Sequence, residues 1–121
     1  MQWKRLIGSF KAAGRGLAEA FKREQNFRLE IVALIIVFAG SLVFRLTSLE
    51  VVIIFLLAGL VLVTELVNTA VEHLLDWVKP RLAMETALIK EVMAAATLIA
   101  AVVAFGGGIL IFFPHFMSLL K

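Results

Sequence analysis

The sequence contains no cysteine, only two prolines and only two histidines in 121 residues. Without cysteine there is no disulfide framework, no thiolate chemistry and no cysteine-based zinc site. The histidines, His73 and His115, lie far apart and form no recognisable metal-binding pair. A Walker A motif and a dinucleotide fingerprint are also absent. The run at 106–108 is glycine only, with no lysine–serine/threonine partner, so close helix packing is its expected role.

Charged residues are scarce and apolar residues abundant. They make up 17% and 62% of the chain, and the mean hydropathy is +1.01. An average soluble domain is about 45–50% apolar. A short soluble chain cannot bury a much larger apolar surface away from water, because small domains keep much of their area exposed. The composition therefore predicts an integral membrane protein. No cleavable signal peptide is expected, because the first apolar run starts only near Ile31.

Residues 1–27 have the pattern of an amphipathic surface helix. Apolar positions recur at steps of three and four, opposite a basic face. Such a helix is expected to lie in the membrane interface; a helix packed on a soluble partner is the alternative. The apolar positions are Trp3, Leu6, Ile7, Phe10, Gly14, Leu17 and Phe21, and the polar face carries Lys4, Arg5, Lys11, Arg15, Glu19, Lys22 and Arg23.

Residues 28–121 are expected to form one all-α transmembrane unit. A span needs about 20 mostly apolar residues, and charged residues at its ends can snorkel to the interface. Pro80 is expected to end the second helix, and residues 79–91 to form a charged connection, partly helical at its end. The predicted spans are 29–47, 50–78 and 92–113.

Basic residues are distributed unequally about these spans. Of the 12 lysines and arginines, all but Arg45 and Lys121 precede the first span or lie between the second and third. Cytoplasmic loops carry the excess of basic residues. The N-terminus is therefore predicted to be cytoplasmic and the C-terminus to lie outside.

The second predicted helix carries a polar stripe. Glu65, Asn68, Glu72 and Asp76 follow at steps of three, four and four, which places them on one helical face. Such groups are costly in lipid, normally face a bundle interior or an aqueous cavity, and mark function. Mg²⁺ is the expected cation, because it takes one or two carboxylates together with substrate phosphates.

Further charges are expected at the same depth, contributed by all three spans. The inventory suits phosphoryl transfer: carboxylates for metal, a lysine for phosphate and a carboxylate to accept a hydroxyl proton. A small proton- or cation-coupled transporter and a non-catalytic membrane subunit are the alternatives. Some of the acids, taken singly, are equally consistent with ordinary interfacial charges. The further charged residues expected at this depth are Glu24, Arg28, Glu30, Lys90 and Glu91.

The stretch ELVNTAVE over 65–72, with Asp76 and then Lys90 after a charged loop, resembles the signature of the prokaryotic diacylglycerol kinase family. That family includes the undecaprenol kinases of Gram-positive bacteria. The resemblance covers nearly the whole chain and includes the pattern of Glu24, Arg28 and Glu30. It implies a homotrimer in the bacterial cytoplasmic (inner) membrane that phosphorylates a lipid alcohol with Mg-ATP, with sites shared between subunits and no nucleic acid partner.

The resemblance also implies roles for individual residues. The NTA triplet and the short N-terminus look closer to the undecaprenol branch than to the diacylglycerol branch. One departure is Lys90-Glu91 where the family usually has Lys-Asp, which moves that carboxylate outward by one methylene. By residue type and spacing, Glu65 matches the base on the lipid hydroxyl, Glu24 and Glu72 the Mg²⁺ ligands, Lys90, Asp76, Glu91, Asn68 and Arg5 the nucleotide side, and Arg28 and Glu30 the lipid side.

Overall fold

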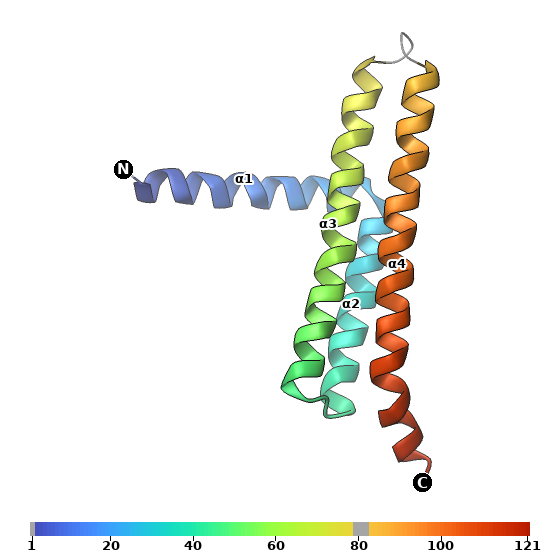
Figure 1. The fold of residues 1–121 in the computed structure, drawn as a ribbon. Helices are drawn as coiled ribbons and strands as arrows, with labels where there is room; N and C mark the ends of the chain where they lie inside the picture. Colours follow the sequence, from blue (N-terminus) through green and yellow to red (C-terminus); the bar gives the residue numbers. More distant parts are fainter. Residues whose placement is uncertain (1, 79–82) are drawn as a thin grey trace.

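The computed structural model describes residues 2–78 and 83–121, and within these ranges it contains four α-helices and no strand. Three of the helices are long and apolar enough to cross a membrane, and a fourth precedes them. This confirms the predicted all-α architecture of three spans behind an N-terminal helix. The helices are α1 (Gln2–Arg23), α2 (Gln25–Val43), α3 (Ser48–Val78) and α4 (Ala83–Leu119) (Figure 1).

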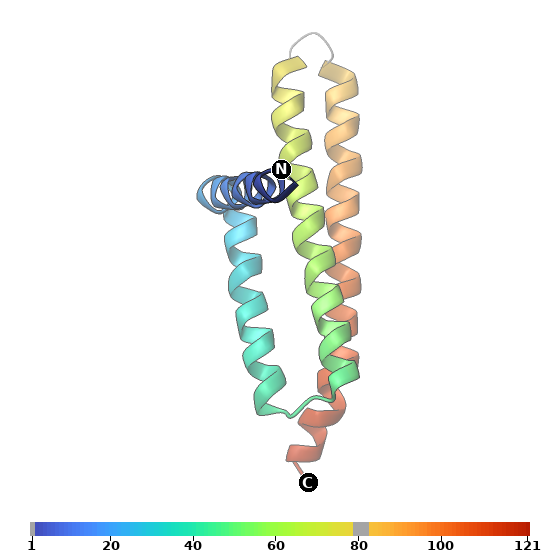
Figure 2. The same ribbon diagram turned by 90° about the vertical axis from the view of Figure 1, so that its left-hand side faces the viewer.

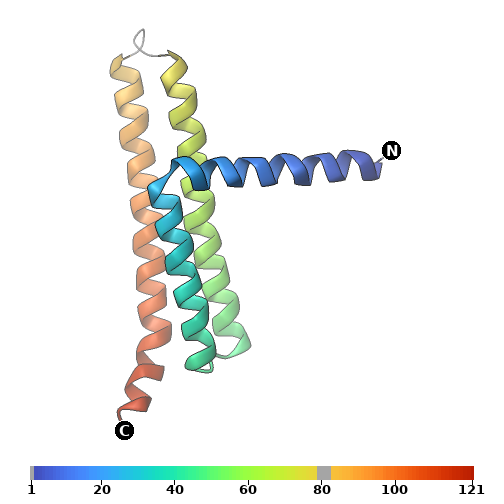
Figure 3. The ribbon, with the colours of Figure 1, turned by 180° about the vertical axis from the view of Figure 1, so that it is seen from behind.

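The three long helices form a bundle, from which α1 projects crosswise with its N-terminal end pointing away (Figure 1). Helices α3 and α4 run antiparallel and make the most extensive contact, while α2 packs mainly on α3 (Figure 2). Beyond the level of α1, only α3 and α4 continue (Figure 3). The bundle therefore has two different ends, one marked by α1 and the other by the turn between α2 and α3.

A sharp corner joins α1 to α2 at Glu24. The Arg28 guanidinium donates from Nη1 to the carbonyl oxygens of Phe21 at 2.7 Å and Lys22 at 3.0 Å. Carbonyls in the last turn of a helix have no intrahelical partner, and a cation there is favourable to the helix dipole. Phe27 is buried at the corner. The surface helix therefore ends four residues before the predicted position 27, because Arg28 binds its last turn.

A capped turn joins α2 to α3. The Leu46 N–H donates to the Ser41 carbonyl at 3.1 Å and the Arg45 N–H to the Leu42 carbonyl at 3.3 Å, with Arg45 at φ 54°. This is a Schellman motif with arginine at the position usually held by glycine. Thr47 and Glu50 then form a reciprocal capping box at the start of α3. Helix α2 therefore ends at Val43 instead of the predicted 47.

Helix α4 is longer than the predicted span at 92–113. It begins at Ala83, so most of the expected connection over 79–91 is helical; residues 79–82, which include Pro80, lie outside the described residues. The segment after Ala83 is rich in good helix formers, and its charged residues are among them. At its other end the helix continues through Pro114 to Leu119, as membrane helices tolerate proline.

Close packing between α3 and α4 depends on one glycine of the run at 106–108. A Cβ atom at Gly107 would lie 2.6 Å from Leu57 Cδ1, whereas one at Gly106 or Gly108 would meet no atom within 4 Å. The expectation that this run serves helix packing therefore holds at Gly107 alone.

The Gly107→Leu variant should be less stable than the parent by about 1–3 kcal/mol, because the new side chain would overpack the contact with Leu57. Thermal unfolding in detergent micelles would measure the loss. Gly106→Leu is the matched control and should unfold near the parent temperature. Equal shifts in the two variants would contradict the assigned packing.

Arg28→Gln should loosen the α1–α2 corner, because it removes charged hydrogen bonds to the last turn of α1. At about 1.5 kcal/mol for such a bond, amide hydrogen exchange in that turn should accelerate about tenfold. Arg23→Gln is the control, since Arg23 pairs only with the exposed Glu19 of the same helix. Similar exchange in both variants would show that Arg28 does not hold the corner.

Candidate functional site

The polar stripe of α3 lies where α1 joins the bundle. A groove between the two helices is lined on α3 by Leu66, Thr69, Ala70 and His73, which occupy the same stretch of helix as the stripe. On the other side of the groove, α1 contributes three small residues and three larger ones, namely Ala13, Gly16, Ala20, Leu17, Glu19 and Arg23. The acids of α3 are therefore placed at the end of the bundle that α1 marks (Figure 1).

The structure brings four of the predicted acids together. Glu65 is the most buried of them, with 4% of its surface exposed. Its carboxylate interacts electrostatically with those of Glu24 and Glu72, and with that of Glu30. These residues come from the α1–α2 corner, from α2 and from α3, so the cluster depends on tertiary packing. Like charges gathered in this way repel one another unless a cation or proton is added.

Asn68 is placed to orient one of these acids. Its Nδ2 lies 3.4 Å from Glu72 Oε1, one turn further along α3, and donates to it. Thr69 donates to the backbone carbonyl of Glu65 at 3.0 Å and leaves the Glu65 carboxylate free for other partners. Within the stripe, an amide therefore holds Glu72.

Lys90 lies at a neighbouring level on α4. Leu57 faces Gly107 across the antiparallel pair. Glu72 follows Leu57 on α3 by the same number of residues as Val92 precedes Gly107 on α4, so Glu72 and Val92 lie at the same level. Lys90 is two residues further, about 3 Å towards the tip of the hairpin. It is half-buried, one helical turn from the buried Thr86. Lysine and acids therefore share one end of the α3–α4 pair.

Three predicted site residues stand apart from the cluster. Asp76 and Glu91 are exposed, and no hydrogen bond or ion pair joins them to the other acids within the described residues. Arg5 is exposed near the free end of α1, away from the bundle (Figure 3). In a single chain it therefore does not meet the carboxylates. The nucleotide-side roles of these three residues stay predictions.

The chain alone does not form a closed metal cage. Within residues 2–78 and 83–121, no group of three or more histidine, cysteine, aspartate or glutamate side chains has the geometry to hold a metal ion. Mg²⁺ normally needs fewer protein ligands, because substrate phosphates and water complete its shell. Glu24 and Glu72, whose charges both act on Glu65, are carboxylates of the kind that such an open site uses.

The sequence analysis missed two features. His115 Nε2 lies 3.1 Å from both carboxylate oxygens of Glu50 and joins α4 to the start of α3 at the far end of the bundle. An apolar cavity of about 440 Å³ lies between α2, α3 and α4, with Glu30 at one end. Both depend on contacts between residues distant in sequence, so periodicity within one helix carries no signal for them.

Comparison with known proteins agrees with this architecture. The family model described as prokaryotic diacylglycerol kinase matches residues 11–112. An undecaprenol kinase of Bacillus subtilis is 36% identical over 110 residues, which cover 91% of this chain and 89% of the relative. A diacylglycerol kinase of Synechocystis is 32% identical over 116 residues, 95% of this chain and 66% of the relative. No solved structure matches. The family match and both relatives cover most of this multi-pass membrane chain, which therefore belongs to the prokaryotic diacylglycerol kinase family.

Proposed function

We propose that this lipid kinase transfers the γ-phosphoryl group of ATP to the hydroxyl of a membrane lipid alcohol. The family match and the names of both relatives support the reaction class. The observation that carries the proposal is the buried Glu65, surrounded by three further carboxylates. A cluster of acids at the edge of an apolar bundle suits a reaction between a membrane alcohol and a water-soluble phosphate donor.

The chemistry is assigned to residues as follows. Glu65 accepts the hydroxyl proton while the alcohol oxygen bonds to the γ-phosphorus, and the bond from that phosphorus to the bridging oxygen of ADP breaks. Glu24 and Glu72 would hold Mg²⁺, which neutralises charge on the phosphates. Asn68 orients Glu72. We assign the binding of the lipid to Glu30 and Arg28, and the binding of the nucleotide to Lys90, Asp76, Glu91 and Arg5.

We assign the end marked by α1 to the cytoplasmic face of a bacterial membrane. Of the basic residues that the structure describes, all but Arg45 and Lys121 lie at that end or on α1, as the positive-inside rule requires. Helix α1 exposes Trp3 and Phe10, 76% and 71% accessible, as expected for a helix that lies in the interface. The parts of α3 and α4 beyond α1 then stand in cytoplasm, where ATP is available (Figure 1).

The proposed homotrimer would place its subunit contact along an exposed apolar seam of α3, which supports self-association. Its apolar positions alternate at steps of four and three, the heptad spacing of helices that pack around a common axis. The seam continues beyond the level of α1, where in the proposed orientation water replaces lipid. Trp77 at its end is 86% exposed. Because water does not solvate this side chain well, we expect a second protein chain to cover it. The seam consists of Leu49, Ile53, Leu56, Leu60, Val63, Val67, Ala70, Leu74 and Trp77, all exposed in the single chain.

Glu65→Gln should lower turnover at least about 100-fold, the usual contribution of a general base, while helix content stays unchanged. The assay is ATP-dependent phosphate transfer in mixed micelles with Mg²⁺, with undecaprenol and diacylglycerol offered separately. Glu19→Gln, on the exposed face of α1, is the control and should keep its activity. If Glu65→Gln retains more than a few per cent of turnover, Glu65 is not the base.

Val63→Cys should give disulfide-linked dimers on mild oxidation, because the seam would bring this position of neighbouring copies together. The chain has no native cysteine, so any cross-link reports on the new one alone. Val102→Cys is a matched control on α4, since both valines are 60% exposed. Cross-linking of Val102→Cys and not of Val63→Cys would place the subunit contact on a different helix.

A further inference from the structure

The outer end of the bundle, which is the end away from α1, carries a polar contact that the kinase chemistry does not use. His115 Nε2 lies 3.1 Å from Oε1 and 3.1 Å from Oε2 of Glu50. The contact joins α4 to the first turn of α3. The two side chains are 26% and 28% exposed. Protons from solution can therefore reach them, while partial burial limits the screening of the contact by salt.

The Glu50 carboxylate also holds the turn between α2 and α3. Its Oε2 accepts a hydrogen bond from the Thr47 N–H at 2.8 Å, and the Glu50 N–H donates to the Thr47 hydroxyl at 3.3 Å. Thr47 follows Arg45, whose φ of 54° is unfavourable for a residue other than glycine. One carboxylate therefore binds the turn, the start of α3 and the end of α4.

Helix α4 is weakened where it meets this carboxylate. Pro114 lies inside the helix and has no N–H, so the carbonyl of Leu110, four residues earlier, loses its helical donor. His115 is the next residue. The helix then continues past the α2–α3 turn (Figure 2). The contact with Glu50 therefore attaches the segment of α4 that the proline loosens.

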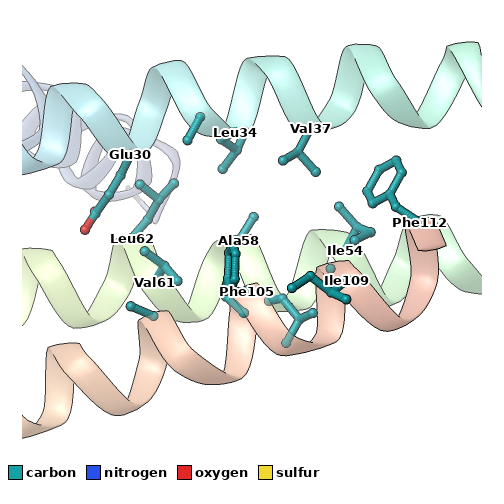
Figure 4. Close-up of a pocket in the computed structure, with 15 residues that line it drawn as sticks. Glu30, Leu34, Val37, Ile54, Ala58, Val61, Leu62, Phe105, Ile109 and Phe112 are labelled. Atoms are coloured by element: carbon teal, nitrogen blue, oxygen red, sulfur yellow. The ribbon is translucent and has the colours of Figure 1, made fainter. Parts of the chain in front are cut away.

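Phe112 attaches α2 at the same level. It lies three residues before His115 and reaches from α4 towards α2 (Figure 4). Its ring packs edge-on against Phe44, with ring centroids 5.8 Å apart, and lies 3.4 Å from the place that a Cβ atom of Gly40 would occupy. The outer ends of α2, α3 and α4 are therefore joined within one helical turn of α4.

We propose that Glu50 and His115 form a proton-sensitive clasp, which holds the outer ends of the three helices together more firmly when the medium at that end is acidic. In the orientation proposed above, this end faces the outside of the cell. The clasp is separate from the phosphoryl-transfer chemistry, so neither proposal depends on the other.

The direction of the pH effect follows from the charges of the two side chains. Histidine ordinarily titrates near about pH 6.5, whereas glutamate ordinarily titrates near about pH 4.3. Between these values an imidazolium faces a carboxylate, and charge-assisted hydrogen bonds are roughly twice as strong as neutral ones. A rise in pH removes the charge of His115 and leaves a neutral ring opposite Glu50. The clasp is therefore firm in acid and weakens as the pH rises through the range of histidine.

The other charged groups at this end do not titrate in that range. The α2–α3 turn contributes Arg45, the end of α4 contributes Lys121, and the last three turns of α2 contribute no charge. Both cations are exposed, and neither forms an ion pair with Glu50 or His115 among the described residues. Lysine and arginine titrate well above pH 8. The pH response of this end therefore depends on His115.

Amide hydrogen exchange tests the clasp without requiring turnover. The full-length protein in micelles is compared at about pH 5.5 and about pH 8, and the protection factors of residues 115–119 are corrected for the intrinsic pH dependence of exchange. We expect about fivefold greater protection in acid, the difference between a neutral and a charge-assisted hydrogen bond. Protection that is the same at both pH values would overturn the clasp.

Two conservative variants assign the effect to the pair. His115→Gln keeps an amide donor that cannot take up a proton, and Glu50→Gln removes the charge but can still complete the capping box. In both variants the protection should no longer change with pH. If Glu50→Gln fails to fold, His115→Gln decides alone, because it leaves the capping box intact.

His73→Gln is the matched control. It removes the one other histidine of the chain, which lines the groove between α1 and α3 at the opposite end of the bundle. This variant should keep the pH response of the parent in residues 115–119. A parental response in His115→Gln, or loss of the response in His73→Gln, would assign the effect to another group and overturn the proposal.

Discussion

The burial of Glu65 among other carboxylates is the constraint on which the rest of the structure depends. One acid in an apolar bundle is already costly, and Glu24, Glu30 and Glu72 increase that cost by repulsion. The cluster lies on the part of α3 that α1 and the start of α2 approach (Figure 1). Repulsion of this kind is relieved when a cation or a proton is added, as the proposed Mg²⁺ would be.

Two features of the fold place the other acids around Glu65. The α1–α2 corner, held by Arg28 on the last carbonyls of α1, brings Glu24 to the cluster. Gly107 faces Leu57 across the antiparallel pair of α3 and α4, and Lys90 lies at the level that this register gives it. Neither Arg28 nor Gly107 needs to touch a substrate in order to matter. Each acts by fixing the position of a helix.

The single chain leaves much of its apolar surface uncovered. For most of the bundle, lipid is a sufficient partner for these side chains. With the membrane placed as proposed, Leu74 and Trp77 of the α3 seam, 60% and 86% exposed, would lie beyond the lipid and would need another partner. The free end of α1 likewise holds Arg5 far from the carboxylates of its own chain (Figure 3). Both observations agree with a site that is completed by neighbouring copies.

The sequence alone determined the class of the protein. The hydropathy, the three long apolar segments and the amphipathic pattern of residues 1–27 are properties of one helix at a time, so composition and local periodicity report them directly. The polar stripe from Glu65 to Asp76 could be placed on one face for the same reason, and the ELVNTAVE stretch pointed to the family. Helix ends were less well predicted, because the Schellman turn at Arg45 and the start of α4 at Ala83 depend on backbone capping and on where water begins.

Only the tertiary structure decided which of these residues meet. It brought Glu24, Glu30, Glu65 and Glu72 together, left Asp76, Glu91 and Arg5 outside the cluster, and paired His115 with Glu50 across 65 positions. It also formed the apolar cavity that ends at Glu30. The physical reason is that these contacts depend on the angles and registers between helices, which arise from packing at a few positions and have no period in the sequence.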